Sequence, residues 1–273
     1  MAATITITTD FGLADGYVAA MKGAILSVNP SANIVDITHQ IAPQNIKEAA
    51  FILSTVYRYF PRGTIHLAII DPGVGTRRKA IILRTPVADF VAPDNGVLSY
   101  IVKDFSGNSN NADIPAPLVA VAISNPRYWR SPVSRTFHGR DIFAPVAAHL
   151  SLGLPPAEFG ESITSVTILP LPVPRKSPDG TISGEVIHID GFGNLITDIT
   201  EQELPGGTPQ IEIGNKIIKG ISTGYRQSKG LLAYIGSSGY LEIAITEGNA
   251  AMSLGAGIGS KVRVREHVAA DSA

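Results

Sequence analysis

The segment "TIHLAIIDPGVGTRRKAIILR", residues 64–84, decides the fold of this chain. An apolar run ends in Asp71, a glycine-rich turn leads to Arg77 and Arg78, and a second apolar run follows. Continuous apolar runs of this length are typical of strands that are buried on both faces of a sheet. Ligands of open α/β sheets bind beyond the carboxyl ends of the strands, so the sequence predicts that Asp71 lies at the rim of a binding site.

Strand-like and helix-like segments alternate through the first half of the chain. Strands are expected at residues 4–8, 33–37, 64–70, 79–83, 89–93 and 117–123, and helices within residues 15–30, 45–60 and 141–153. This alternation is typical of a parallel sheet with helices packed against it. The sequence therefore predicts that residues 1–170 form an α/β N-terminal domain with a largely parallel sheet.

The second half of the chain has a different pattern. Residues 171–180 are rich in proline and are expected to form a linker. After them, segments with a two-residue period are separated by Gly, Asn and Ser turns, and the pairs Gly193-Asn194 and Gly214-Asn215 stand where hairpin turns are expected. Residues 181–273 are therefore expected to form a small antiparallel β domain.

The composition limits the classes of function. The 273 residues include 22 basic and 23 acidic side chains and no basic stripe, so we expect no nucleic-acid partner. No apolar run approaches the roughly 18 residues that cross a bilayer, so no membrane span is expected. The chain has no cysteine, which excludes disulfides, thiolate metal ligands and cysteine nucleophiles. Because the N-terminus also lacks the features of a signal peptide, we expect a cytoplasmic protein.

Polar side chains follow four of the expected strands. The positions that come directly after an apolar run are Asp10, Thr38-His39, Asp71 and Asp94-Asn95. A single Asp beside glycine is more often a helix cap or a turn former, but four such positions together favour one shared site. The carboxylate of Asp10 suits a ribose, because it can accept hydrogen bonds from both hydroxyls of a sugar diol.

Seven motifs follow one another along the chain: "TITTDFGLADGYVAAMKG", "VDITHQIAPQNIKEAAFIL", "FPRGTIHLAIIDPGVGTRR", "VAPDNG", "FHGRDIFAPVAAHL", "IDGFGNLITDI" and "SGYLEIAITEGNAA". Together they resemble the S-adenosyl-L-methionine hydroxide adenosyltransferases, a family related to the fluorinase and the chlorinase. The resemblance covers nearly the whole chain. It implies an enzyme that hydrolyses S-adenosyl-L-methionine (SAM) to adenosine and L-methionine, with no cofactor and no metal ion.

The resemblance also implies which residues form the site. The catalytic Asp, Arg and His of the family correspond to Asp71, Arg78 and His138, and Arg78 is favoured over Arg77 because it stands seven residues after the Asp. The substrate-binding positions implied are Asp10 for the ribose, Asp190, Phe192 and Asn194 for the methionine end, and Ser237, Ser238, Asn249 and Ala250 for the adenine. A homotrimer is also implied, with the site between the α/β domain of one subunit and the β domain of its neighbour.

The resemblance favours hydrolysis over halogenation. The fluorinase has Tyr-Pro-Ala-Thr at the positions of residues 71–74 of this chain. It has Tyr-Ser at the positions where this chain has His138 and Gly139. Methionine leaves as a neutral thioether, so the site needs only an oriented and partly deprotonated water. We expect His138 to accept the proton, because the unperturbed pKa of histidine is about 6.5, and we expect Asp71 and Arg78 to position the reactants and stabilise charge.

Three other interpretations remain open at this point. The Asp-Arg pair could be a structural ion pair, with His138 capping the helix expected near Asp141. A metal-dependent phosphohydrolase would use as ligands Asp10, His39, Asp71 and Asp94, although no HxH or HxD pair supports it. The protein could also bind SAM or adenosine without reacting. Structural roles are expected for the remaining buried-type histidines, His39, His66 and His188.

Overall fold

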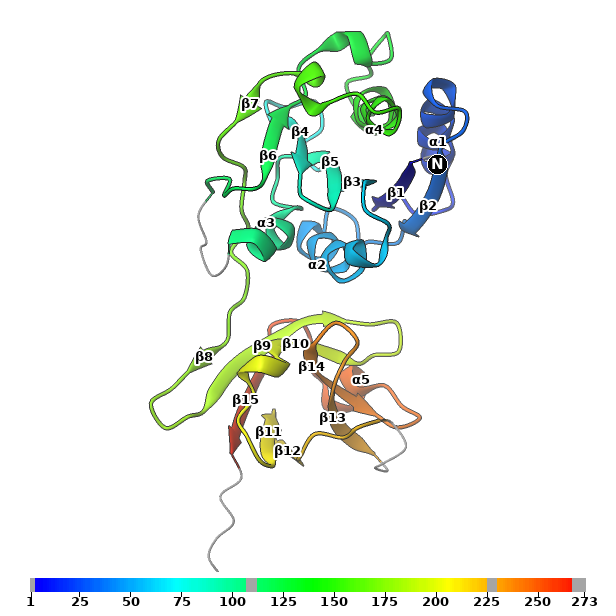
Figure 1. The fold of residues 1–273 in the computed structure, drawn as a ribbon. Helices are drawn as coiled ribbons and strands as arrows, with labels where there is room; N and C mark the ends of the chain where they lie inside the picture. Colours follow the sequence, from blue (N-terminus) through cyan, green and yellow to red (C-terminus); the bar gives the residue numbers. More distant parts are fainter. Residues whose placement is uncertain (1–2, 107–111, 225–229, 267–273) are drawn as a thin grey trace, which may run out of the picture. The chain divides into compact units, whose positions relative to one another are not determined.

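The computed structural model describes residues 3–106, 112–224 and 230–266, and the chain divides into two compact units (Figure 1). Unit 1 comprises Met1–Leu171 and unit 2 comprises Pro172–Ala273. Within the described ranges, no helix has both the length and the apolar character that a bilayer crossing requires.

Unit 1 is a seven-stranded sheet with helices on both faces (Figure 1). Its strands are β1 (Thr4–Thr9), β2 (Asn33–Thr38), β3 (Thr64–Ile69), β4 (Ala80–Arg84), β5 (Ala88–Pro93), β6 (Val119–Ala122) and β7 (Ser162–Ile163). Its helices are α1 (Tyr17–Val28), α2 (Ile46–Val56), α3 (Ser99–Ser106) and α4 (Ala144–Ser151), with a π-helical turn at Gly139–Phe143 and short 3-10 turns at Tyr57–Tyr59, Pro126–Tyr128 and Pro156–Phe159. The strand order is β2-β1-β3-β5-β4-β6-β7.

The sheet of unit 1 is mixed, which differs from the largely parallel sheet expected from the sequence. The pairs β1–β2, β1–β3 and β3–β5 are parallel, whereas β4–β5, β4–β6 and β6–β7 are antiparallel. Residues 85–87 alone join β4 to β5, and a connection this short allows a hairpin but not a parallel crossover, which needs a dozen residues or more. As a result, β4 starts at the rim where β3 ends, and residues 70–79 stay at that rim.

Two hydrophobic cores lie on the two faces of the sheet of unit 1. Helices α1 and α4 cover one face, and α2 and α3 cover the other (Figure 1). Strand β3 is buried along its whole length, with Leu67 and Ile69 in the first core and Ala68 in the second, which also contains the next residue, Ile70. Each fully buried Leu or Ile contributes about 1.5–3 kcal/mol relative to an exposed one, so β3 is held firmly from both sides.

One of the histidines expected to be structural, His66, lies in the middle of β3 with no exposed surface. Its Nδ1 is 2.8 Å from Oγ1 of Thr6, and its ring stacks on Phe90 at a centroid distance of 5.0 Å. Burial lowers the pKa of His66 to about 4, so the ring is neutral at physiological pH.

Unit 2 is built on an antiparallel sheet, as predicted. Its elements are β8 (Arg175–Lys176), β9 (Ile182–Ile189), β10 (Leu195–Thr200), a 3-10 turn (Glu201–Glu203), β11 (Pro209–Ile213), β12 (Lys216–Lys219), β13 (Leu231–Ile235), β14 (Tyr240–Ile245), α5 (Ala250–Leu254) and β15 (Lys261–Glu266). The strand order is β12-β11-β15-β9-β10-β14-β13, with β8 paired to β9. The hairpin expected at Gly214-Asn215 is confirmed, because Ile213 pairs with Lys216 across a two-residue turn.

Candidate active site

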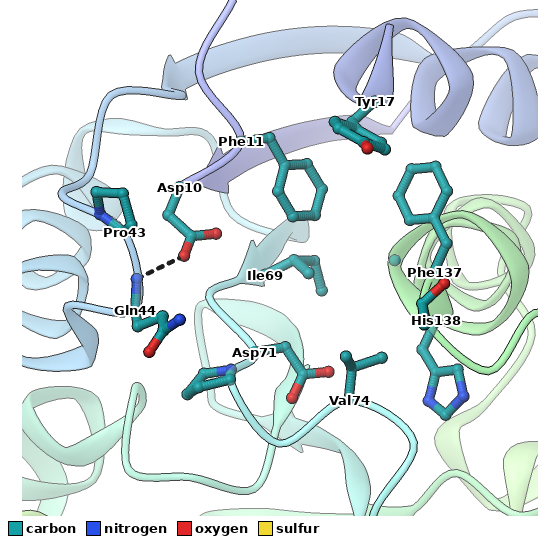
Figure 2. A pocket seen from close by; sticks show the side chains of 13 residues that line it. Asp10, Phe11, Tyr17, Pro43, Gln44, Ile69, Asp71, Val74, Phe137 and His138 are labelled. Carbon is teal, nitrogen blue, oxygen red and sulfur yellow. Dashed lines mark hydrogen bonds between the residues drawn. The ribbon is translucent and has the colours of Figure 1, made fainter. Parts of the chain in front are cut away.

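A pocket of about 440 Å³ opens at the rim where β1 and β3 end (Figure 2). Its walls come from the segments after β1 and β3, from the β2–α2 connection and from the segment before α4. The lining residues are Asp10, Phe11, Tyr17, Pro43, Gln44, Ile69, Asp71, Pro72, Val74, Thr136, Phe137, His138 and Gly139. Three of the residues implied by the resemblance, Asp10, Asp71 and His138, therefore line one cavity.

The carboxylate of Asp71 is held by the guanidinium of Arg78. Nε of Arg78 donates to Oδ1 and Oδ2 of Asp71 at 2.9 and 3.1 Å, and Nη2 also donates to Oδ2. Only 6% of the Asp71 side chain and 11% of the Arg78 side chain are exposed. Arg77, in contrast, is exposed, so the structure pairs Asp71 with the arginine that the seven-residue spacing favours.

The turn between Asp71 and Arg78 brings the two side chains to the same point. The N–H of Val74 donates to the carbonyl of Asp71 at 3.2 Å, and the N–H of Thr76 donates to the carbonyl of Gly73 at 3.1 Å, so two tight turns follow each other. Gly75 has a φ of +75°, and a Cβ added there would lie 2.6 Å from the carbonyl oxygen of Arg135. Only glycine combines this left-handed backbone with so close an approach.

His138 contacts the same guanidinium. Nη2 of Arg78 lies 3.0 Å from Nδ1 of His138. Because a guanidinium can only donate, Nδ1 is the acceptor and the neutral ring carries its proton on Nε2. Burial and the positive charge of Arg78 lower the pKa of His138, against weaker opposing effects of Asp71 and Asp141. The side chain of His138 makes no capping bond to the turn Gly139–Phe143, so the capping role is not realised.

The carboxylate of Asp10 stands on the opposite wall of the pocket, held by the main chain of Gln44 (Figure 2). The N–H of Gln44 donates to Oδ2 of Asp10 at 2.8 Å. Gln44 also has a φ of +64°, which is uncommon for a residue with a side chain. Oδ1 of Asp10 accepts no hydrogen bond from the residues that the structure describes, so it remains available to a ligand.

Three aromatic rings form the apolar wall of the pocket. Phe11, Tyr17 and Phe137 contact one another with centroid distances of 5.3–5.8 Å (Figure 2). Phe137 also carries the guanidinium of Arg140 over its ring at 5.0 Å, and Arg140 pairs with the fully buried Asp141. The three rings therefore present an apolar surface to the cavity, and on the other side Phe137 is held by its contact with Arg140, which is paired with Asp141. Sequence reasoning missed these aromatic residues, because isolated Phe and Tyr residues carry no distinctive pattern.

The other two strand ends serve the site indirectly or not at all. Nδ2 of Asn95 donates to the carbonyl of Ile70 at 2.8 Å, next to Asp71, whereas Oδ1 of Asp94 accepts from the N–H of Thr167 at 2.7 Å. His39 is buried, with Nδ1 at 2.9 Å from Oγ1 of Thr9. The expectation that all four strand ends converge on the pocket is thus correct only for Asp10 and Asp71.

A metal centre built from these residues does not form. In the described part of the chain, no three His, Asp or Glu side chains are grouped so that they could hold an ion. Asp10 accepts a hydrogen bond from Gln44, Asp71 from Arg78 and Asp94 from Thr167, and His39 is hydrogen-bonded to Thr9. The four ligands that a metal-dependent phosphohydrolase would need therefore point to separate partners.

The residues implied for the methionine end lie in the loop between β9 and β10 of unit 2, and hydrogen bonds among them fix its shape. Oδ1 of Asp190 accepts from the N–H groups of Phe192 and Asn194, both at 2.9 Å, and Oδ2 accepts from Nδ2 of Asn194 at 2.8 Å. The side chain of Phe192 is 81% exposed, so it is presented at the surface of this unit. Asp190 thus shapes the loop that carries Phe192.

The residues implied for the adenine lie on two further turns of unit 2. Asn249 caps α5 by accepting from the N–H of Met252 at 2.8 Å, and Ala250 is buried behind it. The N–H of Ala251 donates to the carbonyl of Gly193 at 3.0 Å, which joins the start of α5 to the Asp190 loop. Ser237 and Ser238 occupy the turn between β13 and β14.

Comparison with known families places both halves of the chain in one group. Residues 5–160 match the SAM hydroxide adenosyltransferase N-terminal domain, and residues 184–263 match the SAM hydroxide adenosyltransferase C-terminal domain. Two solved structures are similar over 96% of this chain and 100% of their own. One, of an uncharacterized conserved protein from Thermotoga maritima, has 36% identity and a TM-score of 0.85, and the other, of a conserved hypothetical protein from Thermus thermophilus, has 34% and 0.76.

Curated relatives include both hydrolases and halogenating enzymes. The (R)-S-adenosyl-L-methionine hydrolase of Salinispora tropica is 36% identical over 95% of this chain and 97% of its own, and the hydrolase of Thermus thermophilus is 36% identical over 94% and 97%. The fluorinase of an Actinoplanes species is 28% identical, over 73% of this chain and 72% of its own. The similarity to the hydrolases is therefore both higher and longer than the similarity to this fluorinase.

Proposed function

This chain belongs to the SAM hydroxide adenosyltransferase family, and from that premise we propose that it hydrolyses SAM to adenosine and L-methionine. The relatives that match almost their whole length are SAM hydrolases, which supports hydrolysis over halogenation. The observation that carries the proposal is the contact of one guanidinium, that of Arg78, with both Asp71 and His138 beside the pocket.

The proposed reaction is a single substitution at C5′ of the ribose. The oxygen of a water molecule forms a bond to C5′, and the C5′–S bond breaks with its electron pair moving to sulfur. Methionine leaves as a neutral thioether and takes up no proton, while the water gives up one proton. The task of the protein is therefore to orient water in line with the C5′–S bond and to receive that proton.

Asp71 is assigned the role of accepting a hydrogen bond from the attacking water. Oδ1 of Asp71 accepts one bond from Arg78 and keeps a second lone pair. A carboxylate is a weaker base than an imidazole, but a weak base suffices here. Once the C–O bond forms, the oxygen is positively charged and its proton is strongly acidic, so Asp71 can receive it and pass it to solvent.

His138 is assigned the role of fixing Arg78, which differs from the role expected from residue type alone. To accept a proton at Nδ1, the ring would have to release the guanidinium, and in the neutral ring Nε2 already carries a proton. The lowered pKa of His138 keeps the ring neutral near pH 7 and so preserves the contact. Arg78 is then held by Asp71 on one side and by His138 on the other.

Asp10 is assigned to the ribose and the aromatic wall to the adenosyl group beside it. Oδ1 of Asp10 is free to accept from a ribose hydroxyl, while Gln44 holds Oδ2. The apolar rings of Phe11, Tyr17 and Phe137 limit water in the cavity. A dry pocket favours the reaction, because the positive charge of the sulfonium is spread over the sulfur and the attacking oxygen in the transition state, which depends less on hydration than the concentrated charge of the substrate.

The residues of unit 2 are assigned to the two ends of the substrate. Asp190, Phe192 and Asn194 would contact the methionine end, and the adenine would contact Ser237, Ser238, Asn249 and Ala250. We assign residues 1–170 as the domain of the reacting groups and residues 181–273 as the domain of these contacts, joined by residues 171–180. A homotrimer would place the second domain of one subunit against the first domain of the next. Sedimentation checks the assembly, since a fully active monomer contradicts a shared site.

The direct test is incubation of the purified protein with SAM, followed by chromatographic separation of adenosine and methionine. The two products should appear in equal amounts, and activity should survive treatment with a chelator. Recovery of intact SAM from a protein that binds it would instead identify a binding protein without turnover.

A further inference from the structure

Glu242 is a buried carboxylate for which the proposed reaction has no use. It lies on β14, opposite Ile196 of β10 and Tyr234 of β13. Its neighbours Leu241 and Ile243 point into the core of unit 2, so Glu242 lies on the other face of the sheet. Only 9% of Glu242 is exposed, and burying a carboxylate is costly unless partners compensate for the lost water.

The side chain of Glu242 has a partner for only one of its two oxygens. The hydroxyl of Tyr234 donates to Oε2. Oε1 lies against Gly236, where an added Cβ would overlap it, and it accepts no hydrogen bond from any residue in the described ranges. Gly236 immediately precedes Ser237 and Ser238. A carboxylate oxygen without a donor from the described residues therefore stands beside one of the turns assigned to the substrate.

A second carboxylate acts on Glu242 from the loop assigned to the methionine end. Burial raises the pKa of Glu242, the hydrogen bond from Tyr234 opposes this, and the negative charge of Asp190 raises the pKa further. Asp190 follows β9, and Asn194 leads into β10, the strand beside Glu242. Two like charges at one edge of a sheet repel each other, and a cation bound there relieves the repulsion.

We propose that Glu242 binds the ammonium group at the amino-acid end of the substrate, through Oε1. The inference deepens the proposed function, on which it rests for the identity of the substrate. An ammonium has three donors and a positive charge, so it satisfies the empty oxygen and compensates for Asp190. The amino group of the adenine is a neutral donor that could also bind Oε1. The experiment must therefore distinguish the adenine amino group from the ammonium group.

The test is a calorimetric titration that does not depend on turnover. Three probes are used: SAM, the SAM analogue in which hydrogen replaces the α-amino group, and adenosine. The wild type should bind SAM more tightly than the analogue. Glu242→Gln keeps the shape but removes the charge, so SAM binding should weaken about tenfold or more, while the analogue and adenosine bind as before.

Gly236→Ala provides a second variant that leaves the charge in place. The new methyl group displaces Oε1, and the backbone of Gly236 does not have a positive φ, so alanine is tolerated. SAM binding should weaken in this variant too, with adenosine unaffected. Matched controls are Glu212→Gln, whose carboxylate pairs with Arg265 on β15, and Gly257→Ala, where an added Cβ meets nothing within 4 Å. Both should bind all three probes normally.

Three outcomes overturn the proposal. Weakened adenosine binding with an unchanged preference for SAM over the analogue means that Glu242 contacts the adenine. Equal weakening for all three probes means a structural role, and normal SAM binding in both variants means no role in recognition. A wild type that binds SAM but does not hydrolyse it contradicts the proposed function and leaves the Glu242 result standing, whereas a wild type that binds no SAM contradicts both.

Discussion

Nδ2 of Asn95 donates a hydrogen bond of 2.8 Å to the main-chain carbonyl of Ile70, the residue that precedes Asp71. Ile70 is fully buried, so this carbonyl has no access to bulk water. Oδ1 of Asn95 accepts from the N–H of Val97 at 3.2 Å, so the amide is engaged at both ends. Asn95 thereby fixes the backbone at the point where the carboxylate of Asp71 leaves the sheet.

Asn95→Ala should reduce turnover with a smaller effect on stability. The variant leaves a buried carbonyl without a donor, which costs about 1–3 kcal/mol, and it frees the backbone at Asp71. Misplacement of a reacting group by about 1 Å lowers the rate roughly 100-fold, so kcat should fall by about 10- to 100-fold. The control is Asn33→Ala, which removes an exposed bond to Thr4. Equal kcat values for the two variants would contradict the role of Asn95.

Substitutions of Asp71 and Arg78 should separate stability from activity. Removing one partner of a largely buried ion pair leaves an uncompensated charge and costs about 3–5 kcal/mol, so Asp71→Ala and Arg78→Ala should both lower stability and turnover. The double variant removes both charges and should regain stability while remaining as inactive as the worse single variant. Urea unfolding and product chromatography on the same samples measure the two effects.

A structural ion pair would give a different result for the same three proteins. If the pair served only the fold, activity would return together with stability in the double variant. Arg77→Ala is the matched control, because Arg77 is exposed. His138→Ala should also lower turnover, since Arg78 then loses the hydrogen bond to Nδ1 and keeps Asp71 and the ring of Phe143, whose centroid lies 5.1 Å from Cζ of its guanidinium.

Asp10→Asn should weaken substrate binding more than it affects the fold. The substitution keeps the size of the side chain and removes the charge that accepts from the ribose diol. Affinity for SAM should fall by about tenfold, and the loss should be smaller for 2′-deoxy SAM, which lacks one of the two hydroxyls that Asp10 accepts from. Asp179→Asn, at an exposed turn, is the control. Tight binding of 2′-deoxy SAM by the wild type would exclude the assigned contact.

Chloride or fluoride at high concentration should give no 5′-halo-adenosine. The carboxylate of Asp71 at the pocket repels a halide, and it accepts a hydrogen bond from water that a halide cannot donate. Gly139 offers no hydroxyl to an anion, and a Cβ there would lie 3.2 Å from Sδ of Met21, which leaves little room for a serine. Mass spectrometry of the product formed in H₂¹⁸O with added chloride should show labelled adenosine only.

Stability should fall as the pH drops through the range set by His66. The folded-state pKa of about 4 lies below the unfolded value of about 6.5, so protonation favours the unfolded chain. The contribution of His66 is complete above pH 6.5 and is lost progressively down to about pH 4, which amounts to about 2 kcal/mol between pH 7.5 and pH 5. Urea unfolding at both pH values should show a smaller loss for His66→Gln than for the wild type.

The sequence could predict the elements of unit 1 better than their directions. Apolar runs at β3, β4 and β5 mark buried strands, but a buried strand has the same apolar pattern in either direction. The direction of β4 was available from another feature, the connection of three residues between Arg84 and Ala88, which permits only a hairpin. The antiparallel sheet of unit 2 was easier, because period-2 segments separated by Gly-Asn turns indicate it directly.

Site residues could be predicted from the sequence only where the functional group is in the side chain. Asp71, Arg78 and His138 carry charged or titratable groups, and family motifs mark them. Gln44 contributes a main-chain N–H and has a left-handed backbone, and its residue type indicates neither.

The π-helical turn Gly139–Phe143 makes the position of His138 depend on chain length as well as on residue type. A π-turn contains one residue more than an α-turn, and such insertions are frequent at functional sites. Deleting one residue from this segment would let an α-helix continue into α4 and would rotate His138 by about 100° about the helix axis. Single substitutions across residues 139–143 would leave this requirement unnoticed, whereas a one-residue deletion library would reveal it as an abrupt loss of activity in a folded protein.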